Sequence, residues 1–383
     1  MFTITVTGQD LKVDLLQGSW QLEQVISSKL KKTITLNIKY SNRHKRYFGN
    51  VKSRSITTTL DSINFNPETS LLIFSSHMRN NNLFVLTLTD NKLSGTVSSQ
   101  GNTYKISGLK KDSPPVNIKE YSNYQKTKLP SKDIDLFESK GKTSSSIVLL
   151  IVQGGPFDEI QYSPQQFESW TDKLHIALVK QTQILNPTIL PPENNLSLMD
   201  ARYETKITVD ILHRVIQHFK QQNKKILVWG VSYGAWVIQK YITEYGIDVD
   251  AMSIAAGRLD LEKEIWKEGK LNQKVYDITY KRGKRIYTEM GFTYTKPLSY
   301  LLAAVDEERY TQSLSSKDLS NLVVYQYGKK DGTVGRLNSS EMKFLKSKNV
   351  DIEICNKCYH RQMLSKKIMN SAITKMLEFI DQN

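Results

Sequence analysis

The sequence predicts two parts: an all-β domain over residues 1–112 and an α/β domain over residues 113–383. The second part contains largely apolar runs of the kind found in buried parallel strands, at Ile147–Val152, Ile226–Trp229 and Asn321–Gly328. The first part contains instead short segments that are rich in Thr, Val, Ile, Tyr and Phe and are separated by turn-forming residues. We place the boundary at the double proline Pro114-Pro115.

The closely spaced short segments predict an antiparallel barrel or sandwich of about seven or eight strands in residues 1–112. The expected strands are Phe2–Thr7, Thr33–Tyr40, Ser55–Leu60, Leu71–Ser76, Leu83–Leu88, Lys92–Ser98 and Thr103–Ile106. Together with Gly18-Ser19-Trp20, the segment from Leu93 to Tyr104 loosely resembles lipocalin-like domains. That resemblance implies a small up-and-down barrel.

In the second part, a G-x-S-x-G run lies between an apolar strand and a predicted helix. Gly230-Val231-Ser232-Tyr233-Gly234 follows the strand that ends at Trp229, and Ala235–Ile242 continues with apolar residues at helical spacing. A serine on such a strained turn needs small neighbours, because there is no room for Cβ atoms beside it. The start of the helix also brings backbone N–H groups and a positive dipole to the serine. Ser232 is therefore the candidate nucleophile.

Two residues downstream of Ser232 complete a candidate triad. His360 is the one histidine after Ser232 in the chain, and it lies on a loop behind a predicted strand. Asp331 lies just past an apolar strand, while Asp260, one strand earlier, is the alternative acid. A serine hydroxyl is a poor nucleophile until an imidazole takes its proton, and the imidazole needs a carboxylate to fix its tautomer and stabilise its cation.

The order Ser, Asp, His strongly resembles the α/β-hydrolase family. A second motif supports the resemblance, because the most apolar strand of the chain ends in Gln153-Gly154-Gly155-Pro156, which resembles the H-G-G-P turn of many family members. The resemblance implies an oxyanion hole made by the backbone N–H of Tyr233 and that of Gly154 or Gly155. Gln153 stands where the family usually has histidine.

The same resemblance implies a mostly parallel central sheet with helices on both faces. The residues between Ala256 and Leu322 have a mostly helical pattern, and the resemblance implies that this insertion, at about residues 258–320, is a helical cap. Eight aromatic residues are spread along that insertion, and we expect most of them to pack against one another in the core of the insertion. They are Trp266, Tyr276, Tyr280, Tyr287, Phe292, Tyr294, Tyr300 and Tyr310. The sequence does not assign substrate-binding residues among them.

The function implied by the resemblance is that of a serine hydrolase that cleaves a small acyl ester through an acyl-enzyme, with no metal and no organic cofactor. One alternative is a serine aminopeptidase of the prolyl-iminopeptidase type, suggested by Gly154-Gly155-Pro156 and the cap. Val231 and Tyr233 stand where that branch has Gly and Trp around the serine. The other alternative is a non-catalytic ligand-binding protein whose hydrolase fold is vestigial, which the intact Ser, Asp and His disfavour.

The chain is basic, with 53 Lys and Arg against 38 Asp and Glu. Residues 1–112 carry 15 Lys and Arg against 7 Asp and Glu, most densely at Arg43–Arg46 with Lys52 and Arg54. Our default interpretation is a solvated basic surface, and peripheral contact with anionic lipid or polysaccharide is the alternative. Nucleic acid is not expected as a partner, because only Tyr47 and Phe48 accompany the cluster.

The two cysteines, Cys355 and Cys358, lie just before His360. Free thiols, a short disulfide, and a metal or redox pair all remain open from the sequence. No apolar run is long enough for a transmembrane helix, and the first residues lack the basic segment of a signal peptide. The expected location is the cytoplasm, or outside it if a signal peptide has been removed. The sequence does not give the oligomeric state.

Overall fold

The computed structural model describes residues 16–28, 30–41, 46–53, 56–76, 82–99, 102–111, 124–162, 164–191, 196–261, 271–281 and 284–382. The chain divides into two compact units. One comprises Met1–Gln125 with Pro187–Asn195 and Gly291–Thr295, and the other comprises Lys126–Asn186, Leu196–Met290 and Lys296–Asn383. The expected strand Phe2–Thr7 and the boundary at residues 112–115 lie outside the described residues.

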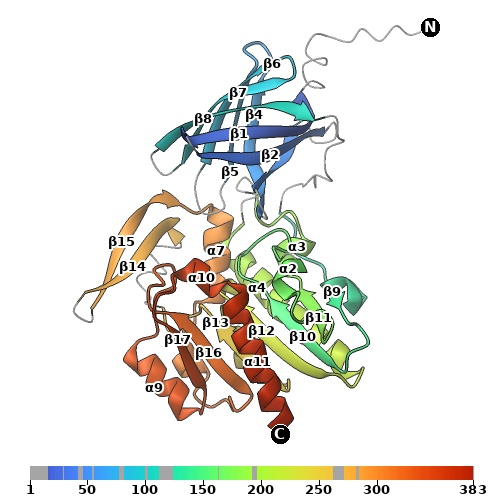
Figure 1. Ribbon diagram of the computed structural model, residues 1–383, viewed down its shortest axis with the longest axis vertical. Helices are drawn as coiled ribbons and strands as arrows, with labels where there is room; N and C mark the ends of the chain where they lie inside the picture. The colour runs from blue at the N-terminus through green and yellow to red at the C-terminus, as the bar shows by residue number, and fades with distance from the viewer. Residues whose placement is uncertain are drawn as a thin grey trace. The chain divides into compact units, whose positions relative to one another are not determined.

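The first unit contains a closed antiparallel barrel (Figure 1). Its strands are β1 (Gly18–Ser27), β2 (Leu30–Ser41), β3 (Arg46–Ser53), β4 (Ile56–Asn66), β5 (Leu71–Ser76), β6 (Asn82–Thr89), β7 (Lys92–Ser99) and β8 (Asn102–Lys111). Each strand pairs with the next one along the chain, and β1 pairs with β8 to close the ring. Between the two architectures that the sequence left open, the structure has the barrel.

The barrel encloses a core of apolar side chains, because alternate residues of each strand point inward. Trp20 and Leu22 on β1 are fully buried, and the rings of Phe74 and Phe84 stack with their centroids 4.6 Å apart. Strands β1 and β3 were not predicted. Their sequences carry charged and amide residues between the inward-facing ones, which dilutes the composition expected of a strand.

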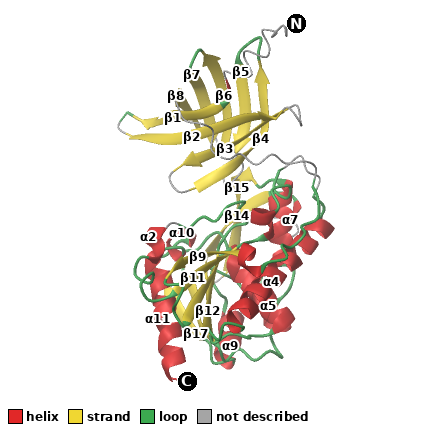
Figure 2. Cartoon of the chain, turned by 90° about the vertical axis from the view of Figure 1, so that its right-hand side faces the viewer, coloured by secondary structure: helices red, strands yellow, loops and turns green. Residues whose placement is uncertain are grey.

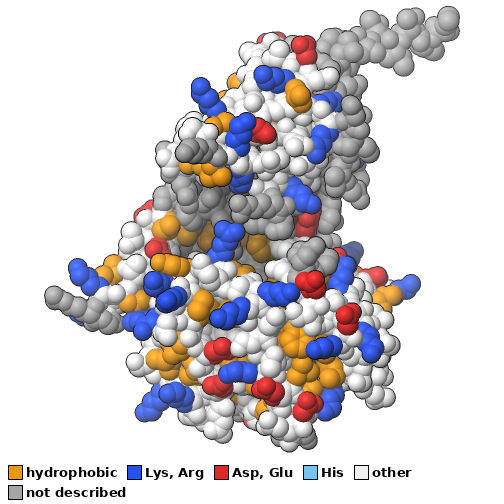
Figure 3. Space-filling view, in the orientation of Figure 1, with side chains coloured by type: hydrophobic (Ala, Val, Ile, Leu, Met, Phe, Trp, Pro, Cys, Tyr) orange, Lys and Arg blue, Asp and Glu red, His pale blue; other side chains and the backbone are white. Residues whose placement is uncertain are grey.

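The described part of the barrel carries mostly Lys and Arg among the charged side chains of the face drawn in Figure 3. Of the predicted basic cluster, Arg46 and Lys52 lie on β3, while residues 42–45 and 54 lie outside the described residues. The guanidinium of Arg46 lies 4.8 Å from the ring centroid of Phe48. Among the described helices of the protein, none combines the length and apolar composition needed to cross a membrane.

The second unit is built on a seven-stranded sheet in the order β17-β16-β13-β12-β10-β11-β9. All neighbouring strands are parallel except the edge strand β9, which is antiparallel to β11. The strands are β9 (Phe137–Gly141), β10 (Ile147–Val152), β11 (His175–Val179), β12 (Lys225–Val231), β13 (Ala251–Ala255), β16 (Leu322–Gly328) and β17 (Asp351–Cys355). The predicted mostly parallel sheet is therefore present.

Helices cover both faces of this sheet (Figure 2). The helical segments are η1 (Asp133–Leu136), α2 (Pro164–Phe167), α3 (Thr182–Leu185), α4 (Leu198–Lys220), α5 (Tyr233–Tyr245), α7 (Lys296–Val305), α8 (Tyr310–Ser313), α9 (Ser339–Ser347), α10 (His360–Met363) and α11 (Lys366–Gln382). Alternate residues of β12, such as Leu227 and Trp229, pack with Met369 and Ile373 of α11, while α4 and α5 cover the opposite face. A strand covered on both sides needs apolar residues at nearly every position, as β10 and β12 have.

The insertion between β13 and β16 differs from the prediction. Instead of a mostly helical cap at residues 258–320, it contains a two-stranded sheet of β14 (Lys274–Lys281) and β15 (Lys284–Thr293), followed by α7 and α8. The sequence carries the signal, since Tyr276, Ile278 and Tyr280 recur at every second position, which is the period of a strand. Residues 262–270, with Trp266, lie outside the described part. We call the β14–β15 sheet the arm.

Candidate active site

Ser232 lies on a sharp turn between β12 and α5. Its φ of 57° and ψ of −117° are sparsely populated for a residue with a side chain, a conformation that costs on the order of 1–3 kcal/mol. Packing holds it there: a Cβ on Gly230 would lie 2.4 Å from Cδ1 of Ile238, and one on Gly234 would lie 2.1 Å from the carbonyl oxygen of Val152. The two glycines of the motif are thus required because strand, turn and helix approach each other closely.

The structure brings Ser232, His360 and Asp331 into one hydrogen-bonded line. Oγ of Ser232 lies 2.9 Å from Nε2 of His360, and Nδ1 of His360 lies 2.7 Å from Oδ2 of Asp331. All three side chains are buried, with Ser232 the most accessible. Ser232 follows the carboxyl end of β12, Asp331 that of β16, and His360 that of β17. Because these strands are parallel, their carboxyl ends lie at the same edge of the sheet.

The partners of Asp331 fix the direction of these hydrogen bonds. Its Oδ1 accepts the backbone N–H groups of Thr333, at 2.9 Å, and Val334, at 3.1 Å. A carboxylate only accepts hydrogen bonds, so Nδ1 of His360 carries the proton on that side. Nε2 is then the acceptor that faces the hydroxyl of Ser232. This is the arrangement in which an imidazole can remove the proton of a serine.

The alternative acid lies elsewhere. Oδ1 of Asp260 accepts the backbone N–H of Thr311 at 3.1 Å, and Oδ2 lies 3.4 Å from Nη2 of Arg309. Its backbone N–H donates to Oε1 of Glu341 at 2.9 Å. The carboxylate that contacts His360 is that of Asp331.

The Gly-Gly-Pro turn after β10 lies against the serine turn. A Cβ built on Gly154 would lie 3.3 Å from Cβ of Ser232, and the carbonyl of Gln153 closely approaches Gly234 in the first turn of α5. Tyr233 begins α5, so its N–H is one of the helix-start donors with no partner inside the helix. Burial raises the pKa of the Tyr233 phenol well above its ordinary value, with Glu204 adding to the shift, so its side chain stays neutral.

Gln153 anchors the chain after this turn with its side chain. Its Nε2 donates to the carbonyl of Glu159 and its Oε1 accepts the N–H of Gln161, each at 2.9 Å. Its own carbonyl accepts Nε2 of Gln181 at 2.8 Å. Sequence reasoning missed Gln181, which lies in a polar segment directly behind the buried strand β11, the place where functional side chains gather in parallel sheets.

Cys355 and Cys358 form a disulfide. The loop that they close is hydrogen-bonded to the segment that leads to Asp331, since Lys329 N–H donates to the carbonyl of Cys355 and Lys330 N–H to that of Cys358, at 2.9 and 3.1 Å. Of the three states open from the sequence, the structure has the disulfide. Within the described ranges, no group of three or more His, Cys, Asp and Glu side chains is arranged to hold a metal ion.

A second serine–histidine contact lies in the same unit. Oγ of Ser139, on β9, lies 2.9 Å from Nε2 of His175, the first residue of β11. Nδ1 of His175 faces Nζ of Lys224 at 3.2 Å. Burial, Lys224 and His218, in that order, lower the pKa of His175 to about 4. Because β11 begins at His175, this contact lies at the opposite end of the parallel strands from Ser232.

No protein-family model matches the chain. No curated protein matches it either. Solved structures resemble part of it. The metagenome-derived lipolytic enzymes LipS and LipT share 11% sequence identity over 64% of this chain and 98% of that chain, with a TM-score of 0.41. MGS-M2, an α/β-hydrolase enzyme from a deep-sea metagenome library, shares 13% identity over 64% of this chain and 94% of its own, with a TM-score of 0.39, and Est1E from Butyrivibrio proteoclasticus shares 13% identity over 63% and 93%, with a TM-score of 0.41. Likeness at this level carries no functional inference, which has to come from the contacts of this chain.

Proposed function

We propose that the protein is a serine hydrolase of the α/β-hydrolase type that cleaves an acyl ester through an acyl-enzyme. The supporting observation is the line from Ser232 through His360 to Asp331, with contacts of 2.9 and 2.7 Å and the proton of the ring on the side of the carboxylate. A serine in this arrangement can pass its proton to the imidazole as it attacks a carbonyl carbon.

In the proposed reaction, Oγ of Ser232 bonds to the acyl carbon while its proton moves to Nε2 of His360. Asp331 stabilises the resulting imidazolium. The backbone N–H of Tyr233 and that of Gly154 or Gly155 stabilise the oxyanion, and the helix dipole of α5 adds to their effect. The tetrahedral intermediate collapses, and the leaving alcohol takes the proton back from His360.

Water then attacks the acyl-enzyme and gives a proton to His360. The carboxylic acid is released as the bond to Oγ of Ser232 breaks, and Oγ takes that proton back from His360. Every step uses side chains and backbone groups of this chain. We assign all of them to the second unit and propose that the barrel, as a separate domain of about residues 1–112, contributes substrate access, docking or stability. Peripheral contact of its basic surface with anionic lipid or polysaccharide belongs to the same proposal.

The test is reaction with a fluorophosphonate probe, followed by a panel of p-nitrophenyl esters and aminoacyl nitroanilides. The expected result is one labelled serine, Ser232, with turnover of short acyl esters. Ser139→Ala is the matched control, because Ser139 has the same 2.9 Å contact with a histidine. Preference for the nitroanilides would favour the aminopeptidase alternative. A folded protein that neither reacts with the probe nor turns over a substrate would support the non-catalytic alternative.

A further inference from the structure

The loop that carries Asp331 has no regular secondary structure between β16 and α9. Two of its backbone carbonyls accept hydrogen bonds from residues in other parts of the chain. Gly332 accepts the N–H of Ile278 at 2.8 Å, and Val334 accepts Nη1 of Arg258 at 3.4 Å. The position of Asp331 therefore depends on segments that precede it by 50 residues or more in the sequence.

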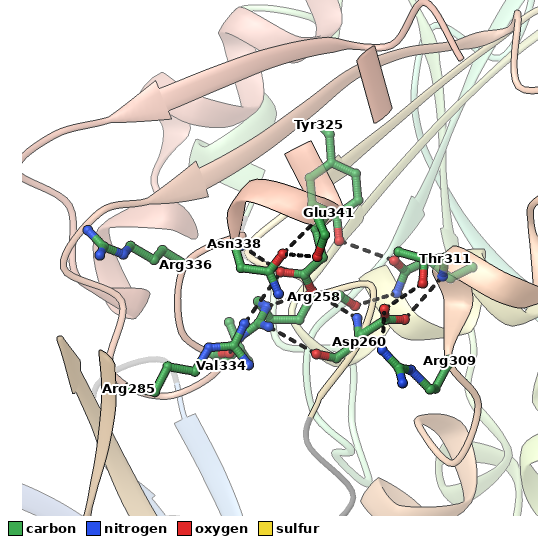
Figure 4. A network of polar contacts seen from close by, with 12 residues as sticks. Arg258, Asp260, Arg285, Arg309, Thr311, Tyr325, Val334, Arg336, Asn338 and Glu341 are labelled. Atoms are coloured by element: carbon green, nitrogen blue, oxygen red, sulfur yellow. Dashed lines mark hydrogen bonds and ion pairs between the residues drawn. The ribbon is translucent and has the colours of Figure 1, made fainter. Parts of the chain in front are cut away.

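Arg258, in the segment that follows β13, extends toward this loop and contacts Val334 (Figure 4). Its guanidinium donates in three directions: Nε to Oε1 of Glu341 at 3.0 Å, Nη1 to the carbonyl of Val334, and Nη2 to the carbonyl of Asp260 at 2.9 Å. The N–H of Val334 in turn donates to Oδ1 of Asp331. One residue, Val334, thus joins the guanidinium to the carboxylate that contacts the histidine.

Arg258 and Glu341 are both fully buried. Both oxygens of Glu341 are used: Oε1 also accepts the N–H of Asp260, and Oε2 accepts the N–H of Asn338 at 2.6 Å and lies 3.6 Å from Nη2 of Arg285. Apolar residues of similar volume commonly replace a buried ion pair with no loss of stability. The presence of a buried Arg258–Glu341 pair is therefore better explained by the geometry that it imposes on neighbouring residues than by a contribution to stability.

The arm contacts the same loop. The hydroxyl of Tyr280 accepts the N–H of Arg336 at 2.9 Å and donates to its carbonyl at 3.2 Å, while the guanidinium of Arg336 lies 3.9 Å from the ring centroid. A Cβ on Gly332 would lie 1.7 Å from Oδ1 of Asp277, so β14 packs directly on the turn after Asp331. The arm thus contacts the segment 332–336 at both of its ends, and Arg258 contacts its middle residue, Val334.

From these contacts we infer that Arg258, held by Glu341, and Tyr280 of the arm are positioning residues for Asp331. They keep the carboxylate at hydrogen-bond distance from His360 and so set how well the histidine can act on Ser232. The insertion between β13 and β16 then supports the acid of the triad in addition to any contact with substrate. This inference rests on the proposed function, which it deepens.

The test uses three variants of the full chain. Arg258→Lys keeps the positive charge beside Glu341 but cannot reach Val334 and Asp260 as well, and Tyr280→Phe keeps the ring but removes both hydrogen bonds to Arg336. The matched control is Arg214→Lys, because Arg214 also donates to a carboxylate, Asp133, and to two backbone carbonyls, at a place remote from the loop.

The first readout is the proton NMR signal of the Nδ1–H of His360, which lies far downfield while a carboxylate accepts it closely. We expect Arg258→Lys to weaken or shift this signal upfield and to lower kcat by on the order of 10²-fold, the effect of about 1 Å of misplacement, with KM changed far less. Tyr280→Phe has the same effects in smaller measure. Arg214→Lys leaves both the signal and kcat unchanged.

A signal that stays in place in both Arg258→Lys and Tyr280→Phe would overturn the inference, even if turnover fell. The NMR signal requires no substrate, which separates the two proposals. The unaltered protein could show the Nδ1–H signal, and the two variants lose it, while the protein neither reacts with the serine probe nor turns over an ester. That result would refute the proposed function and leave the positioning role of Arg258 and Tyr280 in place. Tyr280 is only part-buried, so its variant remains informative if Arg258→Lys fails to fold.

Discussion

The second unit contains two serine–histidine contacts of equal length, Ser232–His360 and Ser139–His175, each 2.9 Å. They differ in what lies at Nδ1 of the ring. A carboxylate accepts the Nδ1 proton of His360, whereas the ammonium of Lys224 donates to Nδ1 of His175. The proton of His175 is then on Nε2 and points at Ser139, so this ring cannot take the proton of its serine.

The surroundings of the two serines differ as well. Ser232 has a strained backbone at the start of a helix and lies beside the Gly154 turn, while Ser139 is exposed in the middle of the edge strand β9. A serine–histidine distance alone therefore says little about reactivity. Proton direction, backbone donors and the end of the sheet at which the pair lies distinguish the two sites.

The largest expected effect belongs to Ser232→Ala. Removal of the attacking oxygen from a triad lowers kcat by about 10⁶-fold, and labelling by the fluorophosphonate should disappear. The measurement is ester turnover together with circular dichroism, which should show an unchanged fold. Labelling that persists at another serine, Ser139 included, would break the comparison.

The second effect comes from Asp331→Asn. The two backbone N–H groups at Oδ1 keep the amide oxygen on their side, so the NH₂ group faces His360 and donates to Nδ1. That gives His360 the proton direction of His175, and we expect kcat to fall by about 10⁴-fold. Asp260→Asn, in the same assay, is the comparison for the alternative acid. A larger loss in Asp260→Asn than in Asp331→Asn would contradict the assignment.

The third effect concerns stability and pH. The folded pKa of His175, about 4, lies below the value of about 6.5 expected in the unfolded chain, so the unfolded state binds more protons between these values. The free energy of unfolding should therefore fall as the pH falls from 6.5 to 4, by about 2–3 kcal/mol from this residue. Denaturant unfolding at several pH values measures the change. His175→Phe keeps a ring against Phe219 and should show a flatter dependence in that window; an unaltered slope would refute the assignment.

The smallest effect is that of Ser139→Ala. Because the proton of His175 points at Ser139, removing this hydroxyl should change neither labelling nor ester turnover. Side-by-side assays with Ser232→Ala check this. A drop in turnover comparable to that of Asp331→Asn would show that proton direction does not separate the two contacts.

The hydrogen-bonded line of Ser232, His360 and Asp331 could be expected because short stretches of sequence mark each residue. Glycines flank Ser232, and a polar residue directly behind an apolar run marks the carboxyl end of a strand, as at Asp331. Since parallel strands end at one edge, residues far apart in sequence could be expected to meet. Asp331 was the preferred acid from the sequence, and Asp260 stayed as the alternative because both follow core strands and only packing separates them.

The arm and the network around Arg258 could not be predicted for a different reason. An arginine in the sequence gives no sign of burial, and the partner of Arg258 is 83 residues away. The period of two at Tyr276, Ile278 and Tyr280 was present, but the whole segment between the two core strands was interpreted as mostly helical. In the barrel, β1 and β3 were missed because charged and amide residues reduce their content of the Thr, Val, Ile, Tyr and Phe residues by which the other strands were identified.

The closure of the barrel has a consequence for how its chain can be rearranged. Ser19, at the start of β1, is paired with Lys111, at the end of β8, so the first and last strands lie side by side. Joining them by a short linker would leave every strand pair intact, and new ends could be opened in an exposed turn such as the one at Asp90 and Asn91. We expect such a circular permutant of the barrel to keep the same ring of eight strands.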